Sequence, residues 1–288
     1  MEPNKYTDAI KRHRVNFNEE EIKNEISRIL TENLILENKR EILKKLYSCI
    51  DLTSLHSTDS RESIWKFTQN VNDFEGSHPE LENVAAICVY PNLVRTVKET
   101  LTADVKIASV AAGFPSSQTF IEVKIAETSL AIADGADEID IVINIGQFKD
   151  KDYQVMCEEI MEIKEVCADR ILKVILETGA LKNFDDIYNA SILSMYSGAN
   201  FIKTSTGKGY PGANPEAFIV MCKAIKSYYE ATGNKVGIKV SGGVSTSADA
   251  VTYYTLVKEI LGEEWCNKSL FRIGTSSLAN VLLEEINV

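Results

Sequence analysis

The chain has 288 residues, of which 44% are hydrophobic and 25% are charged, and these proportions are typical of a globular protein. Its formal net charge of -11 argues against nucleic acid as the main partner, and no apolar run is long enough to predict a membrane span. The six cysteines form no CxxC pair, and the three histidines form no HxH or HExxH pair. We therefore expect free thiols, a cytoplasmic location, no metal site and no cofactor.

Two amphipathic helices are predicted near the N-terminus, at residues 19–30 and 36–47. They fall mainly in an N-terminal helical extension, residues 1–45, which we expect to pack on the bottom or flank of the main domain, residues 46–288. No linker rich in proline, glycine or serine separates the two parts, so a single domain with an extension is predicted.

The main domain alternates between short apolar segments and amphipathic segments. The spacing of Met156, Ile160, Ile163 and Cys167 matches one face of a helix, and Asn214 is a typical residue for the start of another. Strands are predicted at 48–52, 84–90, 105–110, 138–144, 172–177, 201–205, 236–240 and 270–274. This alternation predicts an α/β fold, a closed (β/α)8 TIM barrel. The alternative is an open doubly wound sheet, but no GxGxxG motif follows the first strand.

Two of the predicted strands carry a lysine that points into the barrel. Side chains alternate across a strand, so Lys203 in "FIKTS" and Lys239 in "VGIKV" face away from the side that packs on the helices. By the same alternation Asp140 in "EIDIVIN" faces inward and is a candidate partner for these lysines, and Asp51, late in the first strand, is a second candidate partner. Burying an ammonium without a partner is costly, so a pair of buried lysines needs a chemical reason. The structural alternative is that the lysines are salt-bridged barrel residues or lie on misassigned strands.

Small residues follow three of the strands, at the turns before the next helix. Such turns bring backbone N–H groups close to an anion, and many barrels bind phosphate after strands seven and eight. We therefore expect a phosphate site made by Thr206, Gly207, Lys208, Gly242, Gly243, Gly274, Ser276 and Ser277. Asp51 and Cys88 are expected to line the same substrate pocket, with inert packing as the alternative for Cys88.

A lysine pair of this kind predicts Schiff-base chemistry. A neutral amine attacks an aldehyde or ketone, and the resulting iminium withdraws electrons from the adjacent carbon–carbon bond. A second ammonium nearby lowers the pKa of the attacking amine by repulsion. Asp140 is then suited to transfer protons during these steps. The residues alone do not decide whether Lys203 or Lys239 is the nucleophile.

Several motifs carry a resemblance to a known family: "DLTSL", "AAICVYP", "SVAAGFP", "GADEIDIVIN", "LKVILETGAL", "FIKTSTGKG", "GIKVSGGV" and "FRIGTSSL". They resemble deoxyribose-phosphate aldolase, a Schiff-base aldolase on a (β/α)8 barrel. The resemblance implies that 2-deoxy-D-ribose 5-phosphate is cleaved reversibly to acetaldehyde and D-glyceraldehyde 3-phosphate. It makes Lys203 the Schiff-base lysine, Lys239 the perturbing lysine and Asp140 the proton-transfer residue. It implies a small phosphorylated sugar and acetaldehyde as partners, and it is compatible with a homo-oligomer, a dimer or a tetramer.

Two alternatives to this activity remain at the level of sequence. One is an aldolase-like barrel that acts as a scaffold or interaction protein, since some family members end in a catalytic tyrosine tail and this sequence ends in "LLEEINV". The other is a different Schiff-base barrel, such as a transaldolase or another sugar-phosphate aldolase.

Overall fold

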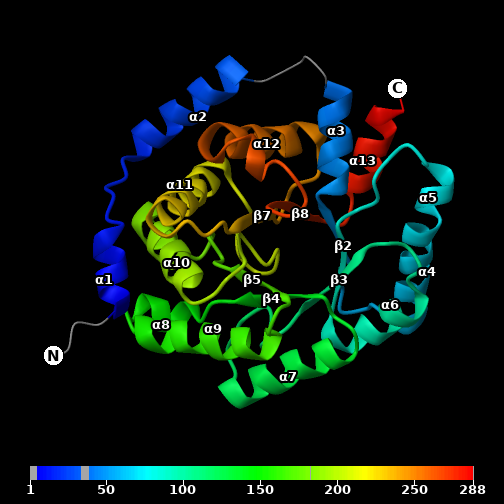
Figure 1. The fold of residues 1–288 in the computed structure, drawn as a ribbon, viewed down its shortest axis with the longest axis horizontal. Coiled ribbons are helices and arrows are strands. Elements are labelled where there is room, and N and C mark those ends of the chain that lie inside the picture. The colour runs from blue at the N-terminus through cyan, green and yellow to red at the C-terminus, as the bar shows by residue number, and fades with distance from the viewer. Residues whose placement is uncertain (1–4, 34–38, 182, 288) are drawn as a thin grey trace.

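The computed structural model describes residues 5–33, 39–181 and 183–287, and its centre is a closed barrel of parallel strands (Figure 1). Each strand pairs with the next one along the chain, and β8 closes the barrel against β1. The strands are β1 Ile50–Thr53, β2 Ala86–Val89, β3 Lys106–Val110, β4 Glu138–Val142, β5 Ile171–Ile175, β6 Phe201–Lys203, β7 Gly237–Ser241 and β8 Phe271–Thr275. Each predicted strand is therefore confirmed, and the alternative of an open sheet is wrong.

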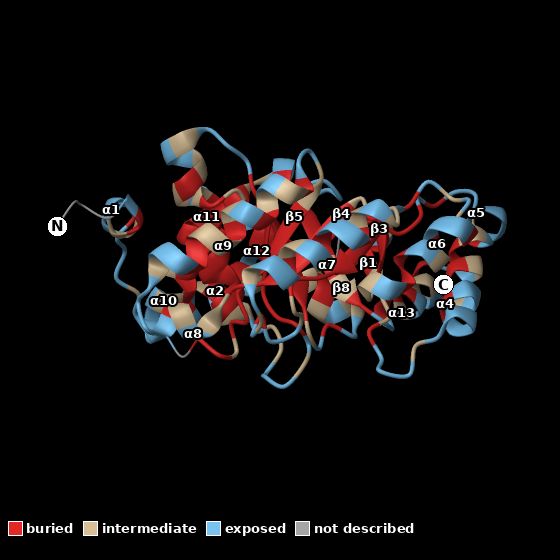
Figure 2. Cartoon of the chain, turned by 90° about the horizontal axis from the view of Figure 1, so that it is seen from below, coloured by how far each residue is buried: buried red, intermediate tan, exposed pale blue. Residues whose placement is uncertain are grey.

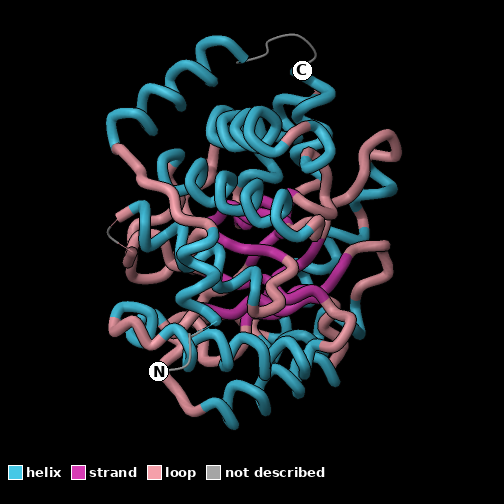
Figure 3. The backbone as a smooth tube through the Cα atoms, turned by 60° about the vertical axis from the view of Figure 1, so that its left-hand side comes forward, coloured by secondary structure: helices cyan, strands magenta, loops and turns pink. Residues whose placement is uncertain are grey.

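A ring of helices encloses these strands, as the tube drawing in Figure 3 also shows. The ring contains α4 Arg61–Asn72, α5 Phe74–Ser77, α6 Val94–Thr100, α7 Ile121–Ala133, α8 Ile145–Lys149, α9 Tyr153–Cys167, α10 Phe184–Tyr196, α11 Pro215–Thr232, α12 Ser247–Leu261 and α13 Leu278–Ile286. Asn214 caps α11 as predicted, because its side chain accepts a hydrogen bond from the backbone N–H of Ala217 at 2.7 Å. Within the described ranges, no helix combines the length and apolar character needed to cross a membrane.

The main hydrophobic core lies between the outer faces of the strands and the helices, where buried residues concentrate in Figure 2. Ile139, Ile141 and Ile143 all belong to this core, so the isoleucine face of β4 packs on the helices as predicted. Each such side chain stabilises the fold by about 1.5–3 kcal/mol when it is fully buried. Because side chains alternate, the same packing turns Glu138 and Asp140 towards the barrel interior.

The barrel interior is divided into an apolar half and a charged half. The apolar half is a small cluster, separate from the main core, that contains Leu55, Ala86, Cys88, Ala108 and Val110. Apart from Leu55 these residues come from β2 and β3. The charged half comes from the other strands, and its side chains are buried despite their charge: Asp51, Glu138, Asp140, Lys173, Lys203, Lys239 and Arg272. Buried charges persist only when they are paired, so this half forms one network.

The N-terminal extension lies against the outside of the helix ring (Figure 1). α2, Glu19–Asn33, packs against α11 and α12, and α3, Lys39–Ser48, packs against α12 and α13. Residues 36–38 of the second predicted helix lie outside the described residues. α1, Lys5–Arg12, has no counterpart among the predicted elements, because a helix of only eight residues gives a weak signal in the sequence.

His13 anchors the start of this extension to the barrel helices. Its Nδ1 lies 2.8 Å from the hydroxyl of Ser227 in α11, and its Nε2 lies 2.9 Å from the hydroxyl of Tyr196 in α10. Burial and the neighbouring Arg12 lower the pKa of His13, so the ring is neutral at neutral pH. The predicted boundary between residues 45 and 46 falls inside α3, which leads directly into β1, and this division of the chain stays a prediction.

Candidate active site

A cavity of about 250 Å³ opens where β1, β6, β7 and β8 end. This is the end of a parallel barrel at which enzymes of this architecture carry their active sites. Among the predicted site residues, the cavity is lined by Lys203, Thr206, Gly207, Lys208, Gly242, Gly243, Gly274, Ser276 and Ser277. It is also lined by residues that were not named individually among the predicted site residues: Thr53, Leu55, His56, Ser241, Val244, Ser245 and Thr275.

Asp140 lies below this cavity and holds three lysines together. Its Oδ2 lies 2.8 Å from Nζ of Lys203 and 2.8 Å from Nζ of Lys239, and its Oδ1 lies 2.8 Å from Nζ of Lys173. Because Lys203 and Lys239 approach the same oxygen, their nitrogens are separated by no more than twice this distance. Strand register explains the approach, since Lys203 on β6 pairs directly with Lys239 on β7 and both side chains point inward.

These three lysines differ in the number of carboxylates around them. Within the described part of the chain, Lys203 ion-pairs only with Asp140. Lys239 pairs with Asp140 and also with Asp51 at 2.5 Å, and Lys173 pairs with three carboxylates. Lys203 also has the most open side chain of the three, with 5% of its surface exposed against 0% for the others. Lys203 is therefore the lysine with the fewest carboxylate partners, and it is the only one of the three that lines the cavity.

The electrostatic environment separates Lys203 from Lys239 in the same direction. Burial lowers the pKa of Lys203, Asp140 opposes this, and the ammonium of Lys239 reinforces it, so the pKa of Lys203 lies below its ordinary value. For Lys239, burial also favours the neutral form, but Asp140 and Asp51 outweigh it and raise the pKa. Burial alone would raise the pKa of Asp140, but the surrounding lysines hold it well below its usual range. The site therefore contains an ionised carboxylate, a charged Lys239 and an easily neutralised Lys203.

A deeper layer of charge supports these groups from below, and its members Glu138, Lys173 and Arg272 were not among the predicted site residues. Nζ of Lys173 lies 2.5 Å from Glu138. The guanidinium of Arg272 contacts Asp51 at 2.6 Å and Glu138 at 2.9 Å. The signal that could have found this layer is strand alternation, because Lys173 interrupts an apolar strand segment just as Lys203 does.

The structure places Asp51 and Cys88 away from the lining of the cavity in which we expect the substrate to bind. Both have 0% of their surface exposed, and neither lines the cavity. Asp51 is enclosed by its ion pairs with Lys239 and Arg272. Cys88 belongs to the apolar half of the interior, where burial raises the pKa of its thiol. Asp51 is part of the charge network and Cys88 fills the apolar half of the barrel, so neither lines the cavity, contrary to our expectation. A contact of either residue with the substrate stays a prediction.

Lys208 spans the cavity mouth. Its Nζ donates a hydrogen bond to the backbone carbonyl of Leu55 at 2.7 Å, which joins the loop after β6 to the loop after β1. Thr206 organises the same loop, since its hydroxyl donates to Glu177 and accepts a hydrogen bond from the backbone N–H of Lys208 at 3.0 Å. Glu177 adopts φ +54, a conformation that is rare outside glycine and typical of functional sites.

Two glycines at the cavity occupy positions with little room for a side chain. Gly242 adopts φ +87, and a Cβ at this position would lie 2.9 Å from the Cα of Gly212 in the adjacent loop. A Cβ on Gly274 would lie 3.0 Å from the Cε of Lys239. Gly274 thus leaves room for the stem of Lys239 to reach Asp140, in addition to lining the cavity.

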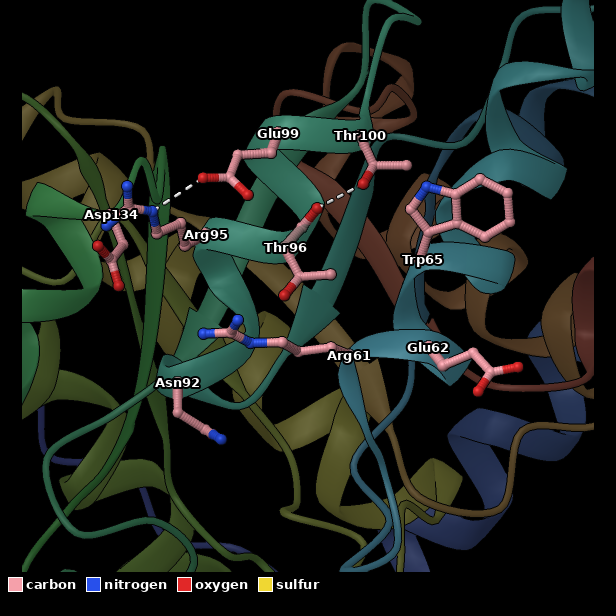
Figure 4. A pocket seen from close by; sticks show the side chains of 9 residues that line it. All are labelled: Arg61, Glu62, Trp65, Asn92, Arg95, Thr96, Glu99, Thr100 and Asp134. Carbon is pink, nitrogen blue, oxygen red and sulfur yellow. Dashed lines mark hydrogen bonds and ion pairs between the residues drawn. The ribbon is translucent and has the colours of Figure 1, made fainter.

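A larger cavity, about 670 Å³, lies on the outside of the helix ring between α4 and α6 (Figure 4). Its lining includes Arg61, Trp65, Arg95 and Asp134. Arg95 is already paired with Glu99 at 2.9 Å, and no lysine lines this cavity. The chemistry of an amine nucleophile therefore belongs to the smaller cavity at the barrel mouth.

Comparison with known proteins decides the family. The family model described as DeoC/LacD family aldolase matches residues 46–262. The chain belongs to this aldolase family. A Caenorhabditis elegans protein with the provisional name deoxyribose-phosphate aldolase is 41% identical over 271 residues, which cover 93% of this chain and 89% of that protein. The human deoxyribose-phosphate aldolase is 37% identical over 255 residues, which cover 85% of this chain and 80% of the human protein.

The fold comparison agrees with the family assignment. The aldolase QR15 superimposes with a TM-score of 0.69 at 28% identity, covering 84% of this chain and 96% of QR15. The family resemblance and the (β/α)8 barrel predicted from the sequence are thus confirmed. In this family a Schiff base on a lysine is the general mechanism.

Proposed function

We propose that this protein is a class I aldolase that reversibly cleaves 2-deoxy-D-ribose 5-phosphate to acetaldehyde and D-glyceraldehyde 3-phosphate, with Lys203 as the nucleophile. The relatives named deoxyribose-phosphate aldolase support this substrate. The observation that carries the choice of nucleophile is the position of Lys203, which opens to the cavity and pairs with a single carboxylate.

In the cleavage direction, Nζ of neutral Lys203 attacks the C1 aldehyde of the open-chain sugar. Loss of water from the carbinolamine gives an iminium at C1. The electron pair of the C2–C3 bond moves into the iminium as the 3-hydroxyl loses its proton, which forms an enamine and releases D-glyceraldehyde 3-phosphate. Protonation of the enamine at C2 and addition of water then release acetaldehyde and return the amine.

Asp140 and Lys239 support these steps in different ways. The carboxylate of Asp140 lies 2.8 Å from the Lys203 amine, a distance at which it holds the nitrogen in place and exchanges its proton through water. Lys239 contacts the same oxygen and keeps its charge, so its repulsion favours the neutral form of Lys203.

The phosphate is expected at the opposite side of the cavity from the reacting carbonyl. Gly242, Gly243 and the start of α13 supply backbone at the loops after β7 and β8. The Ser277 side chain makes no capping hydrogen bond to α13 among the described residues, which suits a hydroxyl that binds an anion. Lys208 lies at the mouth, where its ammonium exchanges the Leu55 carbonyl for the phosphate.

Reductive trapping tests this function. Incubation with acetaldehyde and cyanoborohydride is expected to leave a stable ethyl group on Lys203, found by peptide mass mapping, and deoxyribose 5-phosphate is expected to be cleaved. Lys203→Leu is expected to abolish both signals, whereas Lys226→Leu on the exposed face of α11 is expected to retain them. Failure of the wild-type protein to trap acetaldehyde would favour the scaffold alternative. Trapping with fructose phosphates but no cleavage of deoxyribose 5-phosphate would favour another aldolase.

Two expectations on assembly and location stay predictions. We propose a homo-oligomer, a dimer or a tetramer, which size-exclusion chromatography with light scattering would test. The cytoplasmic location predicted from the free thiols is testable by fractionation, and each cysteine in the structure is unpaired and buried.

A further inference from the structure

The charged half of the barrel interior contains more cationic groups than carboxylates. All of its members are buried: Asp51, Glu138, Asp140, Lys173, Lys203, Lys239 and Arg272. Three are carboxylates and four are cationic when protonated. A cluster with this little solvent access is most stable when its charges cancel. One of the four cationic groups therefore carries a surplus proton that the barrel does not neutralise.

The contacts identify the group that carries the surplus. Arg272 contacts two carboxylates, Lys239 contacts two and Lys173 contacts three. These three cations balance the three carboxylates completely. Among the carboxylate oxygens of the described residues, Lys203 contacts only Oδ2 of Asp140, and Lys239 contacts the same oxygen at 2.8 Å. The surplus proton therefore belongs to Lys203, at the cavity end of the network.

A continuous chain of ion pairs joins the bottom of the network to this lysine. Nη1 of Arg272 lies 2.6 Å from Oδ1 of Asp51, and Oδ2 of Asp51 lies 2.5 Å from Nζ of Lys239. Lys239 then shares the Oδ2 of Asp140 with Lys203. Arg272 is itself held in place by the backbone carbonyl of Lys268 and by the ring of Phe201, whose centroid lies 5.7 Å from Cζ. Arg272 does not line the cavity, so its charge acts on the nucleophile without direct contact with a bound substrate.

We propose that Arg272 and Glu138 are positioning residues that set the protonation state of Lys203 through the charge balance of the barrel interior. This inference rests on the proposed Schiff-base function of Lys203. Removal of the Arg272 charge leaves three cations for three carboxylates, so protonated Lys203 becomes part of a balanced cluster. Removal of the Glu138 charge has the opposite effect, because it increases the positive surplus that Lys203 relieves by losing its proton.

Other ionisable groups face the same region. They are Cys88 on β2, Glu177 after β5, Lys208 in the loop after β6 and His56 after β1, while β3 contributes the apolar Ala108 and Val110. Burial keeps the Cys88 thiol protonated and therefore uncharged. The Glu177 carboxylate is held by the hydroxyl and N–H of Thr206, and Lys208 is held by the Leu55 carbonyl. Among the described residues, none of these groups forms an ion pair with the network. The charge balance of the network can therefore be tested by substituting Arg272 and Glu138.

The test measures the initial rate of acetaldehyde trapping by cyanoborohydride across pH values from about 6 to 10. In Arg272→Met the pH of half-maximal trapping is expected to rise by about one unit, and in Glu138→Gln it is expected to fall by a similar amount. Arg272→Lys retains the charge and is expected to leave the midpoint within a few tenths of a unit. The double variant Arg272→Met/Glu138→Gln is expected to return the midpoint towards that of the wild type.

Outcomes separate this inference from the proposed function. If the wild-type protein traps no acetaldehyde on Lys203, the proposed function is wrong. If it traps acetaldehyde but the midpoints of Arg272→Met and Glu138→Gln stay unchanged, the charge-balance inference is wrong. Circular dichroism checks the fold of each variant. Glu138→Gln, which is nearly isosteric, decides the question if Arg272→Met does not fold, because a structural defect lowers the rate without moving its midpoint downward.

Discussion

Lys239→Met tests how strongly one buried ammonium acts on another. The nitrogens of Lys203 and Lys239 both lie 2.8 Å from the Oδ2 of Asp140, so they are separated by at most twice that distance. At an effective dielectric constant of about 20, two unit charges at this separation repel by about 3 kcal/mol, which corresponds to about two pKa units. Removing Lys239 also leaves the Asp140 oxygen to Lys203 alone, which acts in the same direction.

The sign of the effect on activity follows from the protonation of the amine. A raised pKa keeps Lys203 protonated to higher pH. The ascending limb of the pH profile of kcat/KM for deoxyribose 5-phosphate is therefore expected to shift to higher pH by about two units. At a pH below both midpoints the neutral amine becomes about 100-fold rarer, and activity falls by the same factor. At high pH the neutral form returns, and part of the activity is expected to return with it.

A buried lysine outside the barrel supplies the control. Lys124 in α7 is 1% exposed and pairs with Glu159 at 2.7 Å, so Lys124→Met removes a buried ammonium of the same kind without touching the site. This variant is expected to lose stability but to keep the wild-type pH profile. The reasoning fails if Lys239→Met has lower activity at every pH while the ascending limb of its pH profile stays at the wild-type position, because Lys239 would then contribute chemistry and not charge alone.

Three further variants probe the remainder of the site. Lys208→Met is expected to raise KM for deoxyribose 5-phosphate about tenfold or more and to leave unphosphorylated deoxyribose unaffected, as parallel assays with both sugars would show. Ser277→Asp places a carboxylate in the expected phosphate site and should weaken the phosphorylated substrate far more than the unphosphorylated one; equal losses would contradict an anion site there. Gly274→Ala would bring a Cβ to 3.0 Å from the Cε of Lys239, so we expect a loss of about 1–3 kcal/mol in urea unfolding and lower activity, and wild-type values for both would show that the Lys239 stem adapts freely.

Much of the fold was readable from local patterns. The eight strands, the capped start of α11 and the inward direction of Lys203, Lys239 and Asp140 all follow from periodicity along short segments. Alternation across a strand is a property of the backbone, so it holds wherever one face of the strand is packed against helices. The sequence also placed small residues at the turns that line the cavity, because parallel strands bring their carboxyl ends to the same side.

The depth and pairing of the charged side chains were decided only by the tertiary structure. Nothing in the local pattern distinguishes Asp51, which is sealed among ion pairs, from a residue at the cavity surface, and Cys88 was misplaced for the same reason. The contact between Arg272 and Asp51 joins the last strand of the barrel to the first, across 221 positions of the chain. Sequence alone determined that lysines point into the barrel, whereas ring closure decided how many carboxylates each one meets, because that number depends on the register and distance between strands remote in sequence.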